Sequence, residues 1–142
     1  MTDEPAVVLS QDESWRRLGG VALGRLVTSF AGEPEIFPVN YAVQDRTVLF
    51  RTAEGTKLFS AVGHSVVVFE ADDHDVAEGW SVIVRGRARV LRTAAEIEEA
   101  ERAQLMPWTA TIKKHYVRLT PTDITGRHFT FGPEPDPHAS FA

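Results

Sequence analysis

Apolar and polar residues alternate over much of the chain, which is the pattern of strands with one face toward a core. The clearest alternating segments, each bounded by turn residues, are 21–30, 36–43, 47–52 and 80–91. Residues 65–70 are nearly all apolar, which predicts a strand buried on both faces, and residues 72–79 are predicted to form a loop. Pro121 separates two further predicted strands, 112–119 and 124–131. We therefore expect about seven strands.

Three short helices are predicted from capping residues and glycines. Capping boxes at 10–13 and 93–96 begin two of them, which end at Gly19-Gly20 and near Leu105. A third helix is predicted over 57–62. Connections between strands are short, so consecutive strands should pair antiparallel instead of forming a parallel Rossmann sheet. The predicted fold class is mainly β: a small antiparallel barrel of six or seven strands with short helices outside it.

Residues 38–58 carry the strongest chemical signal. They are predicted to form a strand, a short turn, a second strand ending at Arg51 and Thr52, and a loop leading into a helix at Thr56 and Lys57. A helix start exposes unpaired backbone N–H groups and the positive end of the helix dipole, so it attracts anions. The added guanidinium, ammonium and two hydroxyls make a candidate phosphate cradle. On local sequence alone, the alternative is an ordinary capped helix beside two solvated cations.

Composition limits the class of protein. The 142 residues suffice for one domain, and 43% are hydrophobic and 25% charged, as in globular proteins generally. The net charge of −5 disfavours nucleic acid or an anionic membrane as the main partner. The chain has no cysteine, which excludes disulfides, thiolate catalysis and Cys-ligated zinc. No signal peptide and no apolar run of about 20 residues occur, so we expect a cytoplasmic protein without a membrane partner.

Other candidate sites are weaker. His74 lies among three aspartates, but the spacing of a calcium-binding loop is missing, so a solvated turn is favoured and no metal site is predicted. Arg85, Arg87 and Arg89 either form a solvated strand face or meet a second anionic ligand. No nucleophile elbow is present, and catalytic residues stay unassigned.

Seven short motifs occur in the order and spacing of a known family. They are Gly24-Arg25-Leu26, Pro38-Val39-Asn40-Tyr41, Phe50-Arg51-Thr52, Gly55-Thr56-Lys57, Phe69-Glu70, 79–86 and 124–127. With them, residues 15–131 resemble the flavin-binding split-barrel family of pyridoxamine 5′-phosphate oxidase-like proteins, particularly its short actinobacterial-type members. The resemblance implies a six-stranded split barrel that forms a homodimer, with flavin mononucleotide (FMN) in the groove between subunits.

The resemblance also implies cofactor contacts at ten positions. The isoalloxazine ring would lie along Pro38, Val39 and Asn40, with Trp80 and Ser81 completing its pocket. The ribityl chain and phosphate would lie along Phe50, Arg51 and Thr52, with Thr56 and Lys57 gripping the phosphate. The vitamin-processing oxidases carry Arg-Lys at this helix start, so Arg51 would have to replace the missing charge. The chain is also too short for their C-terminal substrate-binding strand, and oxidation of pyridoxamine phosphate itself is not expected.

The sequence thus predicts an FMN-binding oxidoreductase whose substrate and electron donor are small molecules of unassigned identity, since the cofactor would carry the redox chemistry. Residues 1–131 would form the single flavin-binding domain and residues 132–142 a mobile tail. The alternatives are a non-catalytic carrier or sensor of the same fold, binding a flavin or haem, and a reductase dependent on the deazaflavin F420.

Overall fold

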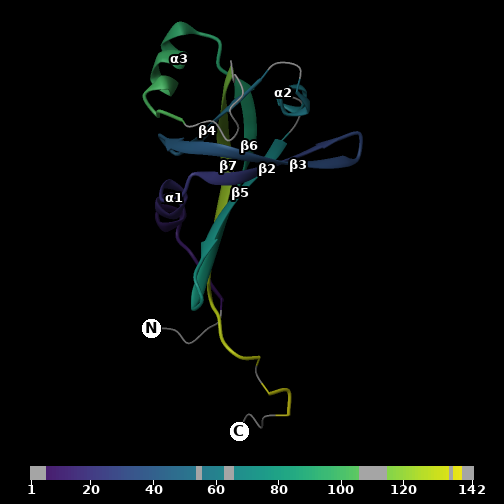
Figure 1. Cartoon of the computed structure of the whole chain (residues 1–142), viewed down its shortest axis with the longest axis vertical. Helices are drawn as coiled ribbons and strands as arrows, with labels where there is room; N and C mark the ends of the chain where they lie inside the picture. The colour runs from purple at the N-terminus through teal and green to yellow at the C-terminus, as the bar shows by residue number, and fades with distance from the viewer. Residues whose placement is uncertain (1–5, 54–55, 63–65, 106–114, 135, 139–142) are drawn as a thin grey trace.

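The structure, a computed structural model, describes residues 6–53, 56–62, 66–105, 115–134 and 136–138. Its strands are β1 (Ala6–Val8), β2 (Leu23–Phe30), β3 (Glu33–Gln44), β4 (Thr47–Thr52), β5 (Val66–His74), β6 (Glu78–Val90) and β7 (His115–Thr130). Its helices are α1 (Gln11–Gly19), α2 (Lys57–Ala61) and α3 (Ala94–Glu101). Figure 1 shows the strands crossing at the centre of the molecule, with α1 at one side and α2 and α3 at the upper end. The predicted fold class is confirmed.

The seven strands form one antiparallel sheet in the order β1-β7-β4-β3-β2-β5-β6. An additional pairing between β7 and β6 closes six of these strands into a barrel, and β1 is added at the far end of β7. Sequence analysis did not predict β1, because three residues are too few for an alternating pattern to stand out.

Each helix begins at a hydroxyl side chain that caps its first turn. Ser10, Thr56 and Thr93 accept hydrogen bonds from the backbone N–H three residues further on, at 3.1, 3.1 and 3.2 Å. The helix α1 ends at the predicted glycine pair. The helix α3 ends at Glu101, earlier than predicted, and only one of its residues is buried, so little packing favours a longer helix.

Two tight turns join the first three barrel strands. Ala31 and Gly32, with φ of 51° and 80°, connect β2 to β3, and Asp45 and Arg46, with φ of 47° and 54°, connect β3 to β4. Positive φ at both turn residues matches the twist of the flanking strands. The strand predicted at 36–43 therefore begins earlier than expected, because two left-handed residues suffice for the turn and β3 begins directly after them.

The predicted loop at 72–79 is wrong. Instead, β5 and β6 continue as a paired hairpin as far as His74 and Gly79. The Asp75 carboxylate stabilises the tip by accepting hydrogen bonds from two backbone N–H groups, at 2.7 and 2.9 Å. Polar side chains on both faces of this extension removed the alternation by which a strand is recognised, although backbone pairing continues.

The two strands predicted on either side of Pro121 are one continuous strand, β7. The register with β6 shifts between Arg85 and Gly86, so Thr122 is the extra residue of a β-bulge, and its hydroxyl donates to the Arg85 carbonyl at 3.2 Å. The bulge accommodates a proline, which lacks an N–H, within a paired strand. A Cβ at Gly86 would collide with the Thr120 carbonyl and lie 2.8 Å from the Pro121 Cα, so the backbones of β6 and β7 approach closely at this glycine.

The barrel interior is filled by alternate residues of each strand. Among its fully buried side chains are Leu26, Val48, Phe50, Val67, Phe69, Val82, Val84, Val117 and Leu119. The helix α1 packs Trp15 and Leu18 into the same core, and the Leu18 carbonyl accepts a hydrogen bond from the Tyr41 hydroxyl at 2.7 Å. The prediction that residues 65–70 are buried on both faces is wrong, since β5 alternates and Val66 is 48% exposed.

The described residues 132–134 and 136–138 lie away from the barrel (Figure 1). Within 132–138, the described residues form neither helix nor strand and are exposed. The mobile tail at 132–142 stays a prediction. Residues 112–114, where the predicted strand was to begin, lie outside the described residues.

Candidate functional site

The ten predicted cofactor residues divide between the two faces of the barrel wall. Four have buried side chains that lie among the interior residues of their strands: Val39, Phe50, Thr52 and Trp80. Thr56 is half-buried and caps α2. Four others lie between two interior residues of the same strand, so their side chains are on the outer face: Pro38, Asn40, Arg51 and Ser81. Lys57 is the first residue of α2 and is exposed. A bound molecule outside the barrel would meet only the outer-face set and Lys57.

Strand register brings part of this outer-face set together. Tyr41 pairs with Phe50, and the same register carried one residue further places Asn40 beside Arg51. Asn40 also pairs with Leu23 across β2. Three strand steps separate β3 from β6 in both directions around the six-stranded barrel. The outward side chains of Asn40 and Ser81 therefore face opposite sides of one chain, whereas Asn40 and Arg51 lie side by side.

The predicted phosphate cradle is only partly available to a ligand. The Thr56 hydroxyl donates to the Ala53 carbonyl at 2.7 Å and accepts from the Phe59 N–H at 3.1 Å, and it lies 3.2 Å from the Thr52 hydroxyl. The five-residue helix α2 is too short for a strong dipole. Lys57, by contrast, has a 78% exposed side chain, and its Nζ lies 3.6 Å from Glu35 Oε1. The positive charge at this end comes from side chains and not from the helix.

Arg51 supplies the second cation of this region. Its guanidinium lies over the Tyr116 ring, 5.0 Å from the centroid, in a cation–π contact. This contact holds a flat, five-donor group at the outer end of β4, where it can recognise phosphate oxygens. The aromatic partner was not predicted, because it comes from β7, far away in the sequence.

Asn40 carries an unusual feature for a residue on a strand. Its side-chain Oδ1 is buried and has no hydrogen-bond partner within the described part of the chain. Leaving a buried acceptor unsatisfied costs about 1–3 kcal/mol. An N–H donor from a ligand or a second chain would remove that cost, so Asn40 marks a position where the molecule is incomplete.

Ser81 belongs to a charged cluster on the same outer face. Its hydroxyl donates to Glu70 Oε2 at 3.0 Å. Arg25 donates to Glu70 Oε1 through Nε and Nη2, at 3.1 and 2.8 Å, and its Nη2 also reaches Asp72 Oδ2 at 2.7 Å. We call Arg25, Glu70 and Asp72 the carboxylate cluster. The cluster links β2 to β5, and the Ser81 hydrogen bond connects it to β6. It lies beside Pro38, which is the strand partner of Arg25.

The two carboxylates of this cluster differ in proton affinity. Burial raises the pKa of Glu70, and the neighbouring Asp72 raises it further, against the opposing effects of Ser81 and Arg25. The pKa of Asp72 is lowered, first by its hydrogen bond with Glu70 and then by Arg25. Of the two carboxylates, Glu70 therefore takes up a proton first as the pH falls.

Sequence reasoning missed the role of this cluster. Arg25 and Glu70 were noted only as parts of family motifs, and Asp72 was assigned to a loop. The usable signal was a charged residue in the middle of each of two otherwise apolar strands. Their pairing depends on the register of β2 with β5, 45 positions apart in sequence.

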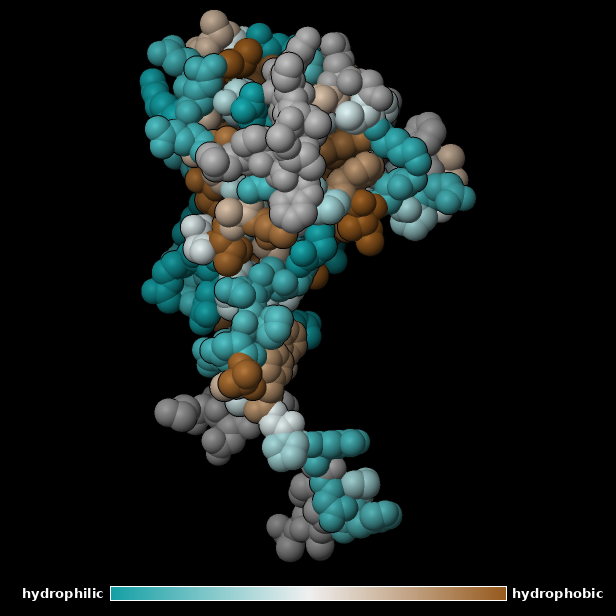
Figure 2. Space-filling view, in the orientation of Figure 1, coloured by the Kyte–Doolittle hydropathy of each residue, from teal (hydrophilic) through white to brown (hydrophobic). Residues whose placement is uncertain are grey.

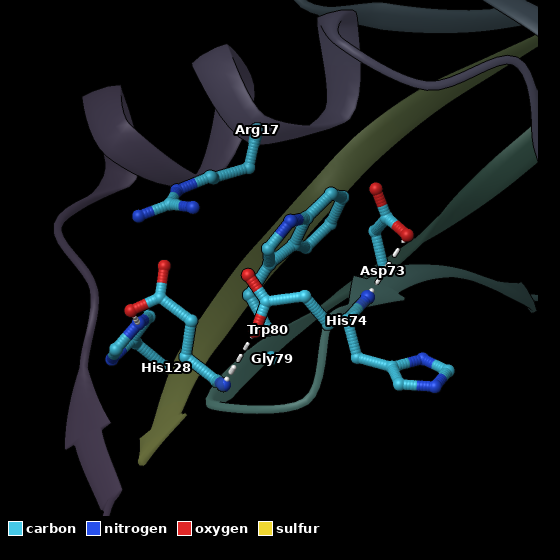
Figure 3. A pocket seen from close by; sticks show the side chains of 8 residues that line it. Arg17, Asp73, His74, Gly79, Trp80 and His128 are labelled. Atoms are coloured by element: carbon cyan, nitrogen blue, oxygen red, sulfur yellow. Dashed lines mark hydrogen bonds and ion pairs between the residues drawn. The ribbon is translucent and has the colours of Figure 1, made fainter. Parts of the chain in front are cut away.

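A polar pocket of about 200 Å³ lies between α1, the β5–β6 hairpin and β7 (Figure 3). It is lined by Arg17, Asp73, His74, Asp75, Glu78, Gly79, Trp80 and His128. The His128 Nε2 lies 3.3 Å from Glu78 Oε2. Trp80 thus faces this pocket, while Ser81, the next residue, faces the carboxylate cluster. The two residues predicted to complete one ring pocket lie on opposite faces of β6 within a single chain.

The three arginines that alternate along β6 are exposed, and two of them have acidic partners. Arg85 lies 3.9 Å from Asp123, and Arg89 pairs with Glu96 at the start of α3. A second pocket, of about 500 Å³, lies beside Arg89 and includes Arg92. These ion pairs favour the interpretation of a solvated strand face.

Two findings concern metals and membranes. In the described ranges, no group of three or more histidines, aspartates or glutamates is placed to hold a metal ion. The longest described helix has nine residues, and none of the described helices is long and apolar enough to cross a membrane.

Comparison with known proteins places this fold and its motifs in one family. A sequence model described as pyridoxamine 5′-phosphate oxidase matches residues 10–128, most of the chain. The chain belongs to this family. Its membership confirms the resemblance drawn from the seven motifs.

Several members of the family are similar in sequence or structure. An uncharacterized protein of Mycobacterium tuberculosis H37Rv, Rv3129, is 71% identical over 100 residues, 70% of this chain and 91% of that protein. The FAD binding protein from Mycobacterium smegmatis is 57% identical, with a TM-score of 0.81 over 88% of this chain and 99% of that one. A conserved protein of unknown function from Corynebacterium diphtheriae is 34% identical, with a TM-score of 0.76 over 89% and 99% of the two chains.

Proposed function

We propose that this chain is a flavin-dependent oxidoreductase that binds the flavin against the outer face of its barrel. The ring would lie near Asn40 and the phosphate end near Arg51 and Lys57, and Ser81 would reach the ring from a second copy of the chain. The unsatisfied Asn40 Oδ1 is the observation that carries the proposal. A flavin ring has an imide N–H whose hydrogen bond a carboxamide oxygen can accept, and buried acceptors in folded proteins rarely stay unpaired.

The flavin form to be tested first is FAD, ahead of the FMN that the motifs suggest. The supporting fact is the M. smegmatis relative, which is FAD-binding and 57% identical to this chain. FMN ends in a phosphate and FAD carries a diphosphate that continues to adenosine, so the first phosphate of either form can use the same cations. Arg51 suits a phosphate because its planar donors match the oxygen geometry, and Lys57 adds a compact positive charge.

In this proposal the bound flavin supplies hydride acceptance and release, and the protein supplies binding, orientation and exclusion of water. No side-chain nucleophile is required. Arg51 and Lys57 would neutralise the phosphate, Asn40 would fix the ring edge, and Ser81 would contact the ring through its hydroxyl oxygen. The electron donor and the substrate would be small molecules.

We further propose that the site is completed by a second copy of the chain. The outer face of the barrel carries an apolar row across three strands, in which Ile36 pairs with Val27 and Val27 with Val68. Ile36 is 65% exposed and Val66 on the same face is 48% exposed. Figure 2 shows hydrophobic residues gathered at mid-height, where β2 and β3 cross the view. A twofold dimer would bury this row next to Asn40 and the carboxylate cluster.

The second candidate function is binding without turnover, as a flavin carrier or sensor. A reductase that uses F420 is a separate alternative. Binding without turnover is supported by the outer-face residues, which can bind a ligand but have no assigned catalytic step. Anaerobic reduction separates these functions. A bound flavin that accepts electrons from NADH, NADPH or reduced F420 supports an oxidoreductase, and one that none of them reduces supports a carrier.

The direct test is titration of the purified protein, freed of cofactor, with FAD and with FMN, followed by flavin fluorescence and absorbance. We expect saturable binding near one flavin per chain, tighter for one of the two forms. F420 and haem are titrated in parallel. Absence of affinity for either flavin would refute the proposed function.

A further inference from the structure

A pocket of about 500 Å³ lies at the end of the barrel where α2 and α3 are found (Figure 1). Its described lining consists of Val62, Arg89, Val90, Arg92, Thr93 and Glu96. Val62 is the C-cap of α2 and Thr93 the N-cap of α3, so the pocket lies between these two helices and the end of β6. Its volume is in the range of small-molecule sites. No residue of the proposed flavin contacts lines it.

The pocket combines apolar walls with an excess of positive charge. Val62 and Val90 are partly buried against the barrel core. Arg89 is paired with Glu96, whereas Arg92 is exposed and forms no ion pair within the described residues. Two guanidiniums and one carboxylate leave the described lining with a net charge of +1. Such a lining suits a ligand with both an aromatic ring and a phosphate, because a guanidinium binds phosphate oxygens and stacks on aromatic faces.

Helix α2 leads from the proposed phosphate end to this pocket. Lys57, its first residue, lies 3.6 Å from Glu35 on β3, whereas Val62 lines the pocket together with Val90 on β6. At 1.5 Å per helical residue, Lys57 and Val62 are about 8 Å apart along α2. A phosphate beside Lys57 and a nucleoside in the pocket can therefore belong to one molecule.

We propose that this pocket binds the adenosine monophosphate half of FAD and so makes the chain selective for FAD over FMN. This inference rests on the proposed function and adds to it the site that distinguishes the two flavins. The first phosphate would lie at Arg51 and Lys57, and Arg92 would supply the charge for the second phosphate. The purine would pack against Val62 and Val90. FMN lacks this half of the molecule and would leave the pocket unused.

The selectivity is measured as the ratio of the dissociation constants for FMN and FAD, from fluorescence titrations of cofactor-free protein at about 0.15 M salt. Wild-type protein should bind FAD more tightly. Arg92→Ala should weaken FAD binding about tenfold, because a charge-assisted hydrogen bond is lost, and leave FMN binding unchanged. Arg87→Ala is the matched control and should change neither affinity, because Arg87 is an exposed arginine of β6 outside the described lining.

Glu96→Gln should have the opposite effect. The pKa of Glu96 is lowered to about 2, first by its hydrogen bond with Arg89 and then by Thr93, so its carboxylate is charged at neutral pH. Glutamine suits the capping box at the start of α3 as glutamate does, and the substitution raises the net charge of the described lining by one. FAD affinity should therefore rise about threefold, and FMN affinity should stay the same.

Competition with AMP tests the pocket itself. AMP should displace FAD and leave FMN bound, because only FAD would occupy the pocket. Displacement of both flavins by AMP, or an Arg92→Ala variant that changes FAD and FMN affinity alike, would overturn this inference and leave flavin binding standing. AMP binding combined with unchanged FAD affinity in Arg92→Ala would also overturn it, because the pocket would then take a free adenine nucleotide. If wild type binds neither flavin, the proposed function fails and this inference fails with it.

Discussion

Replacing Asn40 with leucine should have opposite effects on stability and on flavin binding. Asn40→Leu keeps the branching of the side chain and removes the buried acceptor that has no partner in the described chain. Unsatisfied buried acceptors cost about 1–3 kcal/mol. The residue is half-buried, so the lower end of that range applies. We expect the cofactor-free protein to gain about 1 kcal/mol in the free energy of unfolding.

The gain should be visible as a higher melting temperature. For a chain of this size, 1 kcal/mol corresponds to about 3 °C. With flavin bound, the wild-type acceptor is satisfied and the advantage of leucine disappears. The dissociation constant for flavin should rise about tenfold, since 1.4 kcal/mol is one factor of ten. Thermal unfolding with and without flavin, and fluorescence titration, measure the two quantities.

Gln44→Leu is the matched control on the same strand. The Gln44 amide is already satisfied, because Nε2 donates to the Glu99 carbonyl at 2.9 Å and Oε1 accepts from Arg118 at 3.1 Å. This variant should lose about 1 kcal/mol of stability and bind flavin as wild type does. The reasoning about Asn40 is refuted if Asn40→Leu melts lower than wild type without flavin and keeps the wild-type affinity.

Four further results are expected. Lys57→Ala should weaken flavin binding about tenfold, less at high salt, because a charge-assisted hydrogen bond is lost; equal affinity in both proteins would exclude Lys57 from the phosphate site. Gly86→Ala should lower the free energy of unfolding by about 1–3 kcal/mol, measured by urea unfolding, because the added methyl group collides with the β7 backbone. Gly132→Ala, with open space around it, should leave stability unchanged. Ile36→Lys should shift sedimentation from dimer to monomer by placing a charge in the apolar row; a variant that remains dimeric would assign the interface elsewhere. Folding raises the pKa of Glu70, so its contribution to stability is present at low pH and lost as pH rises through the raised value; Glu70→Gln should remove that slope in urea unfolding measured against pH.

The sequence alone determined the elements whose signals are local. Capping hydroxyls and terminal glycines act within one turn of helix, so α1 and the start of α3 were predicted correctly. Alternation over β4 and the turn at Asp45 and Arg46 were likewise predicted, since a hairpin turn depends only on adjacent residues. The strand pattern also predicted a small antiparallel barrel, and the family motifs added the flavin hypothesis, which composition and periodicity do not contain.

Only the tertiary structure decided what depends on residues far apart in the sequence. From sequence alone, Pro121 predicts the end of a strand. In the structure, the bulge at Thr122 opposite β6 allows β7 to continue past this proline. The β5–β6 hairpin is polar on both faces, so its pairing is set by the partner strand and not by its own pattern. The carboxylate cluster arises because register places Glu70 beside Arg25 and Ser81, and the unsatisfied acceptor of Asn40 follows from which strands cover it. Sequence spacing carries local backbone preferences, whereas hydrogen-bond partners across a sheet are set by register and closure, which are properties of the whole barrel.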